Sequence, residues 1–373
     1  MAAGADDTFR LTNLAFLAAG IKLNTDLATT ITEFATEPLF SDWKDAKIMK
    51  GWRASPVRIT VMCLSLDEKL LVVCDDAGKL RLWDHFTCKL VAEVQAHDAS
   101  ITDVRVKDDK KLTDILVTVS AGHEIKVWNS KTLALLGQMT TPEHPSILVH
   151  HSRLLVGLPA GLVSHNLPGL EKNVKAPILA RDFTMMALAP DGSSMFFCSP
   201  HTHTASINFI VKHKRWAGRQ FASNTKTVHD AHYWYAVYSP NSKMVLAITE
   251  DSELHLLKDV GAETVQVRKW SDVEVDDACF MGNTLVACTV ANTNGISIRD
   301  IAGFDMQHIG EYDIAQVLVF CRNTDNSQPP KIFATNRDGF LEEWSPWYRK
   351  PKEITSKLTG KMVLAGFNEY EVA

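Results

Sequence analysis

The sequence predicts an all-β fold built from one repeating unit of four short strands. Similar strings recur along the chain, namely GKLRLWD, HEIKVWN, NGISIRD and DGFLEEWS. Trp83 and Trp128 are 45 residues apart in these strings, and so are Arg299 and Trp344. Short runs rich in Val, Ile and Leu lie between them, separated by Asp, Gly and Asn, as is typical of antiparallel strands.

Composition agrees with a folded chain. The 373 residues are 46% apolar and 22% charged, close to globular averages, which excludes wholesale disorder, collagen and coiled coil. A net charge of −5 argues against nucleic-acid binding over the whole surface. The seven cysteines form no CxxC pair, so we expect free thiols in a reducing compartment, intracellular and either cytoplasmic or nuclear. No apolar run is long enough for a membrane span.

The first repeat shows the expected strands most clearly. Its runs are ITVMCLSL, LLVVC, KLRLWD and KLVAEVQ. The first two are almost wholly apolar, as expected of strands buried on both faces. The third alternates, which predicts that Leu80 and Leu82 face inward while Lys79 and Arg81 lie on a half-exposed side. The aspartate pairs at 75–76, 108–109 and 276–277 are interpreted as solvated turn residues.

The repeat length predicts the number of units. Trp83 and Trp344 are 261 residues apart, and six steps give about 43.5 residues each, within the range of four-stranded propeller blades. We therefore expect a seven-bladed β-propeller over 46–347, a helical N-terminal arm over 1–45 and a C-terminal extension over 348–373. Later blades are expected at about 144–179, 183–222, 232–271, 275–313 and from 315 onward.

The strings AGKLRLWD, HEIKVWN and RDGFLEEWS resemble the WD-repeat family of β-propellers, and the resemblance covers roughly 46–347. It implies a rigid interaction platform. By this resemblance His97 looks like the family's buried loop histidine, hydrogen-bonded toward the strand that carries Trp128. Trp52 either replaces that histidine in the preceding loop or is an exposed anchor for a partner.

Closure of the ring requires a strand from one terminus to join the blade that contains the other. The segment KIMKGWRASPVRITV aligns with LVAEVQAHDASITDV, so residues near 46–51 are expected to pair with the strand ending at Trp344. KMVLAGF at 361–367 is the alternative. The expected helices within 9–34 either pack on the propeller rim or form a dimerisation handle.

Catalytic chemistry has little support in the sequence. No GxSxG, GxxxxGK[ST] or GxGxxG string occurs, so we expect neither an enzyme nor a bound cofactor. HTH at 201–203 and HDAH at 229–232 could form a zinc-like site, but no Asp, Glu or Cys stands beside them at a known ligand spacing. Solvated loop histidines are the favoured interpretation, with no metal.

Two basic segments, 212–219 and 347–361, leave RNA or ribonucleoprotein binding as an alternative function. The interpretation that we favour is a lysine-protected edge strand for the first and a flexible tail for the second. The patch in the first segment consists of Lys212, Lys214, Arg215, Trp216 and Arg219.

The favoured function is a non-catalytic scaffold or adaptor within an intracellular multiprotein complex, with a metal-binding or enzymatic propeller as the third hypothesis. Binding is expected on the face formed by the loops before each inner strand and the turns between second and third strands. The expected partner-binding residues on that face are Trp52, Arg53, Asp98, His123, His144, His201, His203, Asp251, Asn292 and Arg337.

Overall fold

The computed structural model describes sixteen stretches of the chain. They are residues 47–65, 67–107, 115–150, 152–172, 185–192, 194–199, 204–209, 225–229, 233–260, 263–270, 274–283, 285–290, 295–301, 306–309, 318–321 and 331–345. The expected N-terminal helices, the segment 361–367 and both basic segments lie outside these stretches.

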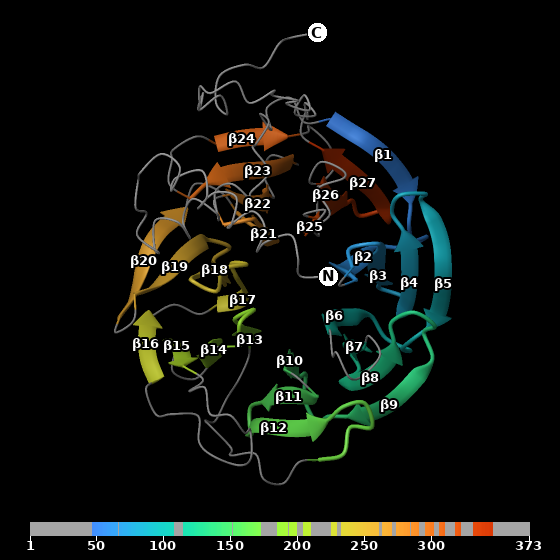
Figure 1. Ribbon diagram of the computed structural model, residues 1–373, viewed down its shortest axis with the longest axis horizontal. Helices are drawn as coiled ribbons and strands as arrows, with labels where there is room; N and C mark the ends of the chain where they lie inside the picture. The colour runs from blue at the N-terminus through green and yellow to red at the C-terminus, as the bar shows by residue number, and fades with distance from the viewer. Residues whose placement is uncertain are drawn as a thin grey trace, which may run out of the picture. The chain divides into compact units, whose positions relative to one another are not determined.

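The described residues are organised as antiparallel sheets in which consecutive strands are neighbours (Figure 1). We number these sheets as blades in chain order. Blade one contains β2 (Ile59–Leu64), β3 (Leu70–Asp75), β4 (Lys79–Asp84) and β5 (Lys89–Gln95). Blade two contains β6 (Ile101–Lys107), β7 (Ile115–Ser120), β8 (Glu124–Asn129) and β9 (Leu135–Thr140).

The next three blades follow the same order. Blade three has three described strands, β10 (Ser146–His150), β11 (Arg153–Leu158) and β12 (Gly161–Asn166). Blade four contains β13 (Met185–Leu188), β14 (Ser194–Ser199), β15 (Thr204–Phe209) and β16 (Thr225–His229). Blade five contains β17 (Tyr233–Tyr238), β18 (Met244–Thr249), β19 (Leu254–Val260) and β20 (Glu263–Trp270).

The last two sheets include both ends of the described chain. Blade six contains β21 (Ala278–Met281), β22 (Leu285–Val290), β23 (Gly295–Asp300) and β24 (Met306–Ile309). Blade seven is composite, because β25 (Leu318–Cys321), β26 (Lys331–Thr335) and β27 (Phe340–Ser345) are completed by β1 (Lys47–Arg53) as the outer strand beside β27. The expected pairing of residues near 46–51 with the strand that contains Trp344 is therefore confirmed.

Residues 48–344 form one compact unit. Within it the first strand of each sheet contacts the first strand of the next, and β25 of blade seven contacts β2 of blade one. Figure 1 shows these first strands as the innermost ones. Apolar side chains fill the spaces between neighbouring sheets; Val72, Leu80 and Leu82 of blade one, for example, pack with Leu116 and Trp128 of blade two. Burial of these faces is what favours the stacking of amphipathic sheets.

The expected strands of blades one and two agree closely with the structure, while blade four differs. Its outer strand was expected to end near residue 222, but β16 spans Thr225–His229. His229 is therefore a strand residue and not part of a connecting loop. β16 is the last strand of this sheet in the described part of the chain, and the segment 212–219, expected as a lysine-protected edge strand, lies outside the described residues.

Candidate functional site

The loops before the inner strands and the turns between second and third strands meet at one end of the blades. The same backbone hydrogen bond joins them repeatedly: a loop N–H donates to a carbonyl of the preceding turn. The bonds are Ala54 and Ser55 to Gly339 (3.0 and 3.1 Å), Ala96 and His97 to Gly78 (both 3.0 Å), Thr141 to His123 (2.9 Å) and Val275 to Ser252 (3.0 Å). We call this end the loop face; its described part consists of residues 54–58, 76–78, 96–100, 121–123, 141–145, 159–160, 250–253, 274–277 and 336–339.

These turns share a left-handed residue at the accepting position. The φ angles are 75° at Gly78, 61° at His123, 60° at Ser252 and 77° at Gly339. Glycine is required where the loop approaches closely, because a Cβ at Gly78 would lie 2.1 Å from the His97 carbonyl oxygen. The loop face is therefore a platform whose loops are fixed by backbone hydrogen bonds.

Blade two supports the platform with hydrogen bonds centred on the buried side chain of His97. His97 Nε2 lies 2.8 Å from Thr118 Oγ1, and Trp128 Nε1 donates to the same hydroxyl at 2.9 Å. His97 Nδ1 lies 2.9 Å from a carboxylate oxygen of Glu124. Burial lowers the pKa of His97, the hydrogen bond to Glu124 opposes the shift, and the charge of Lys126 adds to it. The structural role expected for His97 is confirmed.

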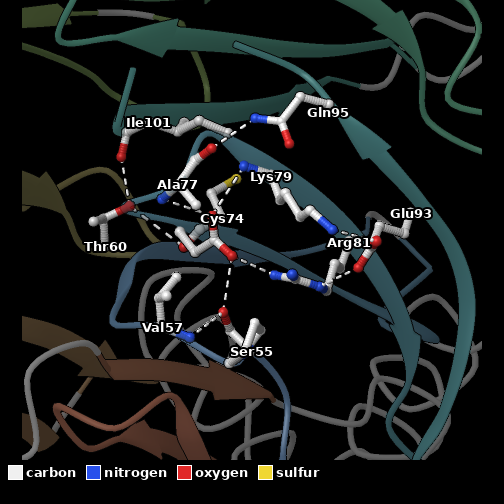
Figure 2. Close-up of polar contacts among 12 residues, drawn as sticks. Ser55, Val57, Thr60, Cys74, Ala77, Lys79, Arg81, Glu93, Gln95 and Ile101 are labelled. Atoms are coloured by element: carbon white, nitrogen blue, oxygen red, sulfur yellow. Dashed lines mark hydrogen bonds and ion pairs between the residues drawn. The ribbon is translucent and has the colours of Figure 1, made fainter. Parts of the chain in front are cut away.

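Blade one supports its part of the face with charge instead (Figure 2). Asp75 is fully buried, and its carboxylate accepts from Ser55 Oγ at 2.8 Å and from the guanidinium of Arg81. Arg81 Nε also meets Glu93 at 2.6 Å, and Lys79 Nζ meets the other oxygen of Glu93 at 2.8 Å. The expectations of a solvated Asp75 and a half-exposed Arg81 are both wrong. Both side chains are buried, and their ion pair compensates for the loss of hydration.

Trp52 belongs to the packing between blades seven and one. Its ring is half-buried, lies 6.3 Å from the ring of Trp83 and packs on a cluster that includes Leu71 and Leu341. Ser55, whose backbone makes the same bond as that of His97, occupies the place of the loop histidine. Trp52 therefore neither replaces that histidine nor stands free as an anchor.

The other expected partner-binding residues divide into exposed, half-buried and undescribed groups. Exposed on the loop face or at its margin are Arg53, Asp98, His144, Asp251 and Arg337. His123 is half-buried, and its ring centroid lies 6.1 Å from that of His144, whose Nε2 is 2.9 Å from Thr102 Oγ1. His201, His203 and Asn292 lie outside the described residues, as does the patch of Lys212, Lys214, Arg215, Trp216 and Arg219.

Sequence reasoning missed three exposed residues of this region. Arg58 precedes β2, Val57 is 36% exposed in the same loop, and Phe340 is 39% exposed at the start of β27. The sequence did offer one signal for them: Val57 and Arg58 closely follow the expected Arg53, and Phe340 closely follows the expected Arg337.

Where the structure describes the chain, three or more His, Cys, Asp or Glu side chains do not gather in an arrangement that could hold a metal ion. No helix that could cross a membrane occurs among the described residues.

Comparisons with known proteins agree with this architecture. The WD40 family, described as "WD domain, G-beta repeat", matches residues 88–129. Eukaryotic translation initiation factor 3 subunit I of Bombyx mori is 29% identical over 96 residues, which cover 26% of this chain and 28% of that relative. The chain thus matches well under two thirds of the relative's length.

A solved structure extends the comparison to most of the chain. The β-propeller domain of Cps50 (Swd1) from Myceliophteria thermophila aligns with a TM-score of 0.65 and 11% identity, covering 80% of this chain and 99% of that domain. At this identity the match shows the fold. Taken with the stacked four-stranded sheets and the His97–Thr118–Trp128 network, these matches show a β-propeller fold in which residues 88–129 match the WD-repeat family.

Proposed function

We propose that this protein is a seven-bladed propeller that acts as a non-catalytic interaction scaffold in an intracellular multiprotein complex. The propeller would cover 46–347, with 1–45 and 348–373 as an arm and an extension. The relative with the matching segment is named as a subunit of a larger factor, which supports a role as a complex subunit. Six described cysteines are free thiols, which supports a reducing compartment.

The observation that carries the proposal is the loop face. Its loops are held by backbone bonds and by buried networks in blades one and two, so little conformational entropy remains to be lost on binding. Charged side chains stand exposed on this fixed base, among them Arg53, Asp98 and Arg337. A rigid surface with exposed arginines is typical of a protein-binding face.

Affinity purification from the native cell followed by mass spectrometry tests this function. The wild-type chain should retain a stable set of partners, and the double variant Arg53→Glu, Asp98→Lys should lose the principal one while keeping its thermal stability. Partners that survive this change but are lost when residues 1–35 are deleted would assign recognition to the N-terminal segment instead.

A further inference from the structure

The junction of blades seven and one on the loop face combines arginines with exposed apolar side chains. Arg53 ends β1, Val57 and Arg58 stand in the following loop, Arg337 lies in the turn between β26 and β27, and Phe340 begins β27. Val57 and Phe340 are 36% and 39% exposed, and the three arginines are exposed as well. We call these five residues the arginine patch.

Backbone contacts bring the two segments of the patch together. The N–H groups of Ala54 and Ser55 both donate to the Gly339 carbonyl, at 3.0 and 3.1 Å. A Cβ on Gly339 would lie 2.3 Å from the Ser55 carbonyl oxygen and 2.4 Å from that of Val57. Residues 53–58 and 336–340 therefore lie backbone against backbone, although almost the whole ring separates them in sequence.

The same loop is fixed from below. Ser55 Oγ accepts from the Val57 N–H at 3.2 Å (Figure 2). The same hydroxyl donates to buried Asp75 at 2.8 Å. The Arg58 carbonyl accepts from the Asp76 N–H at 3.0 Å, which links the loop to the turn of blade one. The backbone of the patch is thus preorganised, while its five side chains remain exposed.

The guanidinium groups of Arg58 and Arg337 form no hydrogen bond or ion pair with any described residue. Arg53 makes two long hydrogen bonds, from Nε to the Ser55 carbonyl at 3.4 Å and from Nη2 to the Pro56 carbonyl at 3.3 Å. Those bonds orient Arg53 without neutralising its charge. Three positive charges thereby remain available to a ligand, and arginine pairs with carboxylates in bidentate geometry.

Phe340 adds an apolar element to this charged surface. A Cβ on Gly51 would lie 3.0 Å from Phe340 Cε1, so the ring rests against backbone that carries no side chain. One part of the ring is covered by β1 while 39% of the residue stays exposed. Aromatic and arginine side chains are enriched at protein interfaces and among the residues that dominate binding energy.

Charge elsewhere on the loop face has the opposite sign. The turn of blade five exposes Glu250 and Asp251, and the loop before β21 exposes Glu274 and Asp276. Next to the patch the exposed carboxylates are those of Asp338 and Asp76, and Asp76 accepts from Ser100 Oγ at 2.9 Å. Three arginines against two aspartates leave the junction positive on a chain whose net charge is −5.

We propose that the arginine patch binds an acidic peptide segment of a partner protein. Its carboxylates pair with Arg58 and Arg337, and an apolar side chain between them packs on Val57 or Phe340. Repulsion from the acidic residues exposed by the blade-five turn and by the loop before β21 would orient the peptide on the junction. This inference rests on the proposed scaffold function and names the partner class.

Selection from an unbiased displayed peptide library, with the full chain as bait, tests the proposal. Selected peptides should be rich in Asp and Glu around an apolar residue. The double variant Arg58→Glu, Arg337→Glu should weaken binding of a selected peptide at least about tenfold, and affinity should fall as salt rises. Lys243→Glu is the matched control, because Lys243 is exposed in the turn between β17 and β18, away from the loop face, and binding should be unchanged.

Phe340→Ser separates the apolar contribution, since it leaves every charge in place; the selected peptide should bind more weakly to it as well. The proposal fails if no peptide is selected, if the selected peptides lack acidic residues, or if the arginine variant and the lysine control behave alike. A single-stranded RNA that displaces the peptide with equal affinity would also overturn it.

The two proposals can fail separately. If native partners are retained by the wild-type chain and by the Arg58→Glu, Arg337→Glu variant, the scaffold function stands and the arginine patch does not. If acidic peptides bind the patch but no partner co-purifies from the cell, the patch is a peptide site and the scaffold function is wrong.

Discussion

Blades one and two have the same four-strand plan and the same place in the loop face, yet they are stabilised by different chemistry. Blade two has a neutral hydrogen-bonded network of His97, Thr118 and Trp128. Blade one instead buries the ion pair of Asp75 and Arg81. The strand pattern therefore determines the four-stranded fold of each blade. The polar network beneath the loops can differ between blades, provided that it satisfies the buried polar groups.

The difference between the two networks can be traced to single residue positions. Leu71 pairs with Trp83 and Leu116 with Trp128, so Val73 in blade one stands where Thr118 stands in blade two. Without a hydroxyl at that place, Trp83 Nε1 is buried and has no hydrogen-bond partner. The WD40 family matches 88–129, the stretch that contains the complete network of blade two.

The largest effect is expected from Asp75→Ala. It would leave the buried guanidinium of Arg81 with only the partly exposed Glu93, and unfolding free energy should fall by about 3–5 kcal/mol. Denaturant unfolding of the full chain measures this loss. Asp76→Ala is the neighbouring control; since Asp76 is exposed, its loss should stay below about 1 kcal/mol. Equal losses in the two variants would show that the buried pair does not stabilise blade one.

Thr118→Val tests the network of blade two by giving it the residue type found in blade one. Trp128 Nε1 and His97 Nε2 would both lose their buried partner, and stability should fall by about 2–3 kcal/mol in the same unfolding experiment. Thr118→Ser keeps the hydroxyl and should cost less. A loss as large for serine as for valine would mean that packing of the methyl group, and not hydrogen bonding, governs this site.

The network of blade two should also make the stability of the chain depend on pH. Burial lowers the pKa of His97, so the unfolded chain binds this proton more readily than the folded one. The contribution of neutral His97 to the free energy of unfolding is fully present above about pH 6.5, the pKa of histidine in the unfolded chain. It is lost as pH falls through the lower pKa of His97 in the folded chain. The melting temperature of His97→Gln should therefore decline less steeply between about pH 6.5 and 5 than that of the wild type. A parallel decline would exclude His97 as a titrating group here, since His85 also has a pKa lowered by burial and would then account for the slope.

The smallest effect is expected from Val73→Thr, which brings blade one closer to blade two. The new hydroxyl can accept from Trp83 Nε1, as Thr118 Oγ1 does from Trp128 at 2.9 Å. This gain offsets the loss of a buried methyl group, so stability should change by less than about 1 kcal/mol. A loss near the 2–3 kcal/mol expected of Thr118→Val would show that Trp83 cannot reach the new acceptor.

Local sequence signals predicted the strands of blades one and two because apolar runs and the glycine-containing turns DDAG and SAGH are encoded within a few residues. They did not predict the burial of Asp75, whose partners Ser55 and Arg81 come from another loop and another strand. The outer strand of blade four was misplaced because TKTVH has no alternating apolar pattern. The arginine patch was only half foreseen, since a loop near residue 57 meets a turn near residue 338 only after the ring closes.

Hydrogen exchange of the full chain, free and within the complex purified from its native cell, tests the central claim most directly. Binding of the partners should slow exchange in the loop face, most of all in residues 54–58 and 336–340 of the junction. The amides of the outer strands β5 and β9 should exchange alike in the two states. Protection confined to those outer strands, with the junction unchanged, would contradict the assignment of partner binding to the loop face.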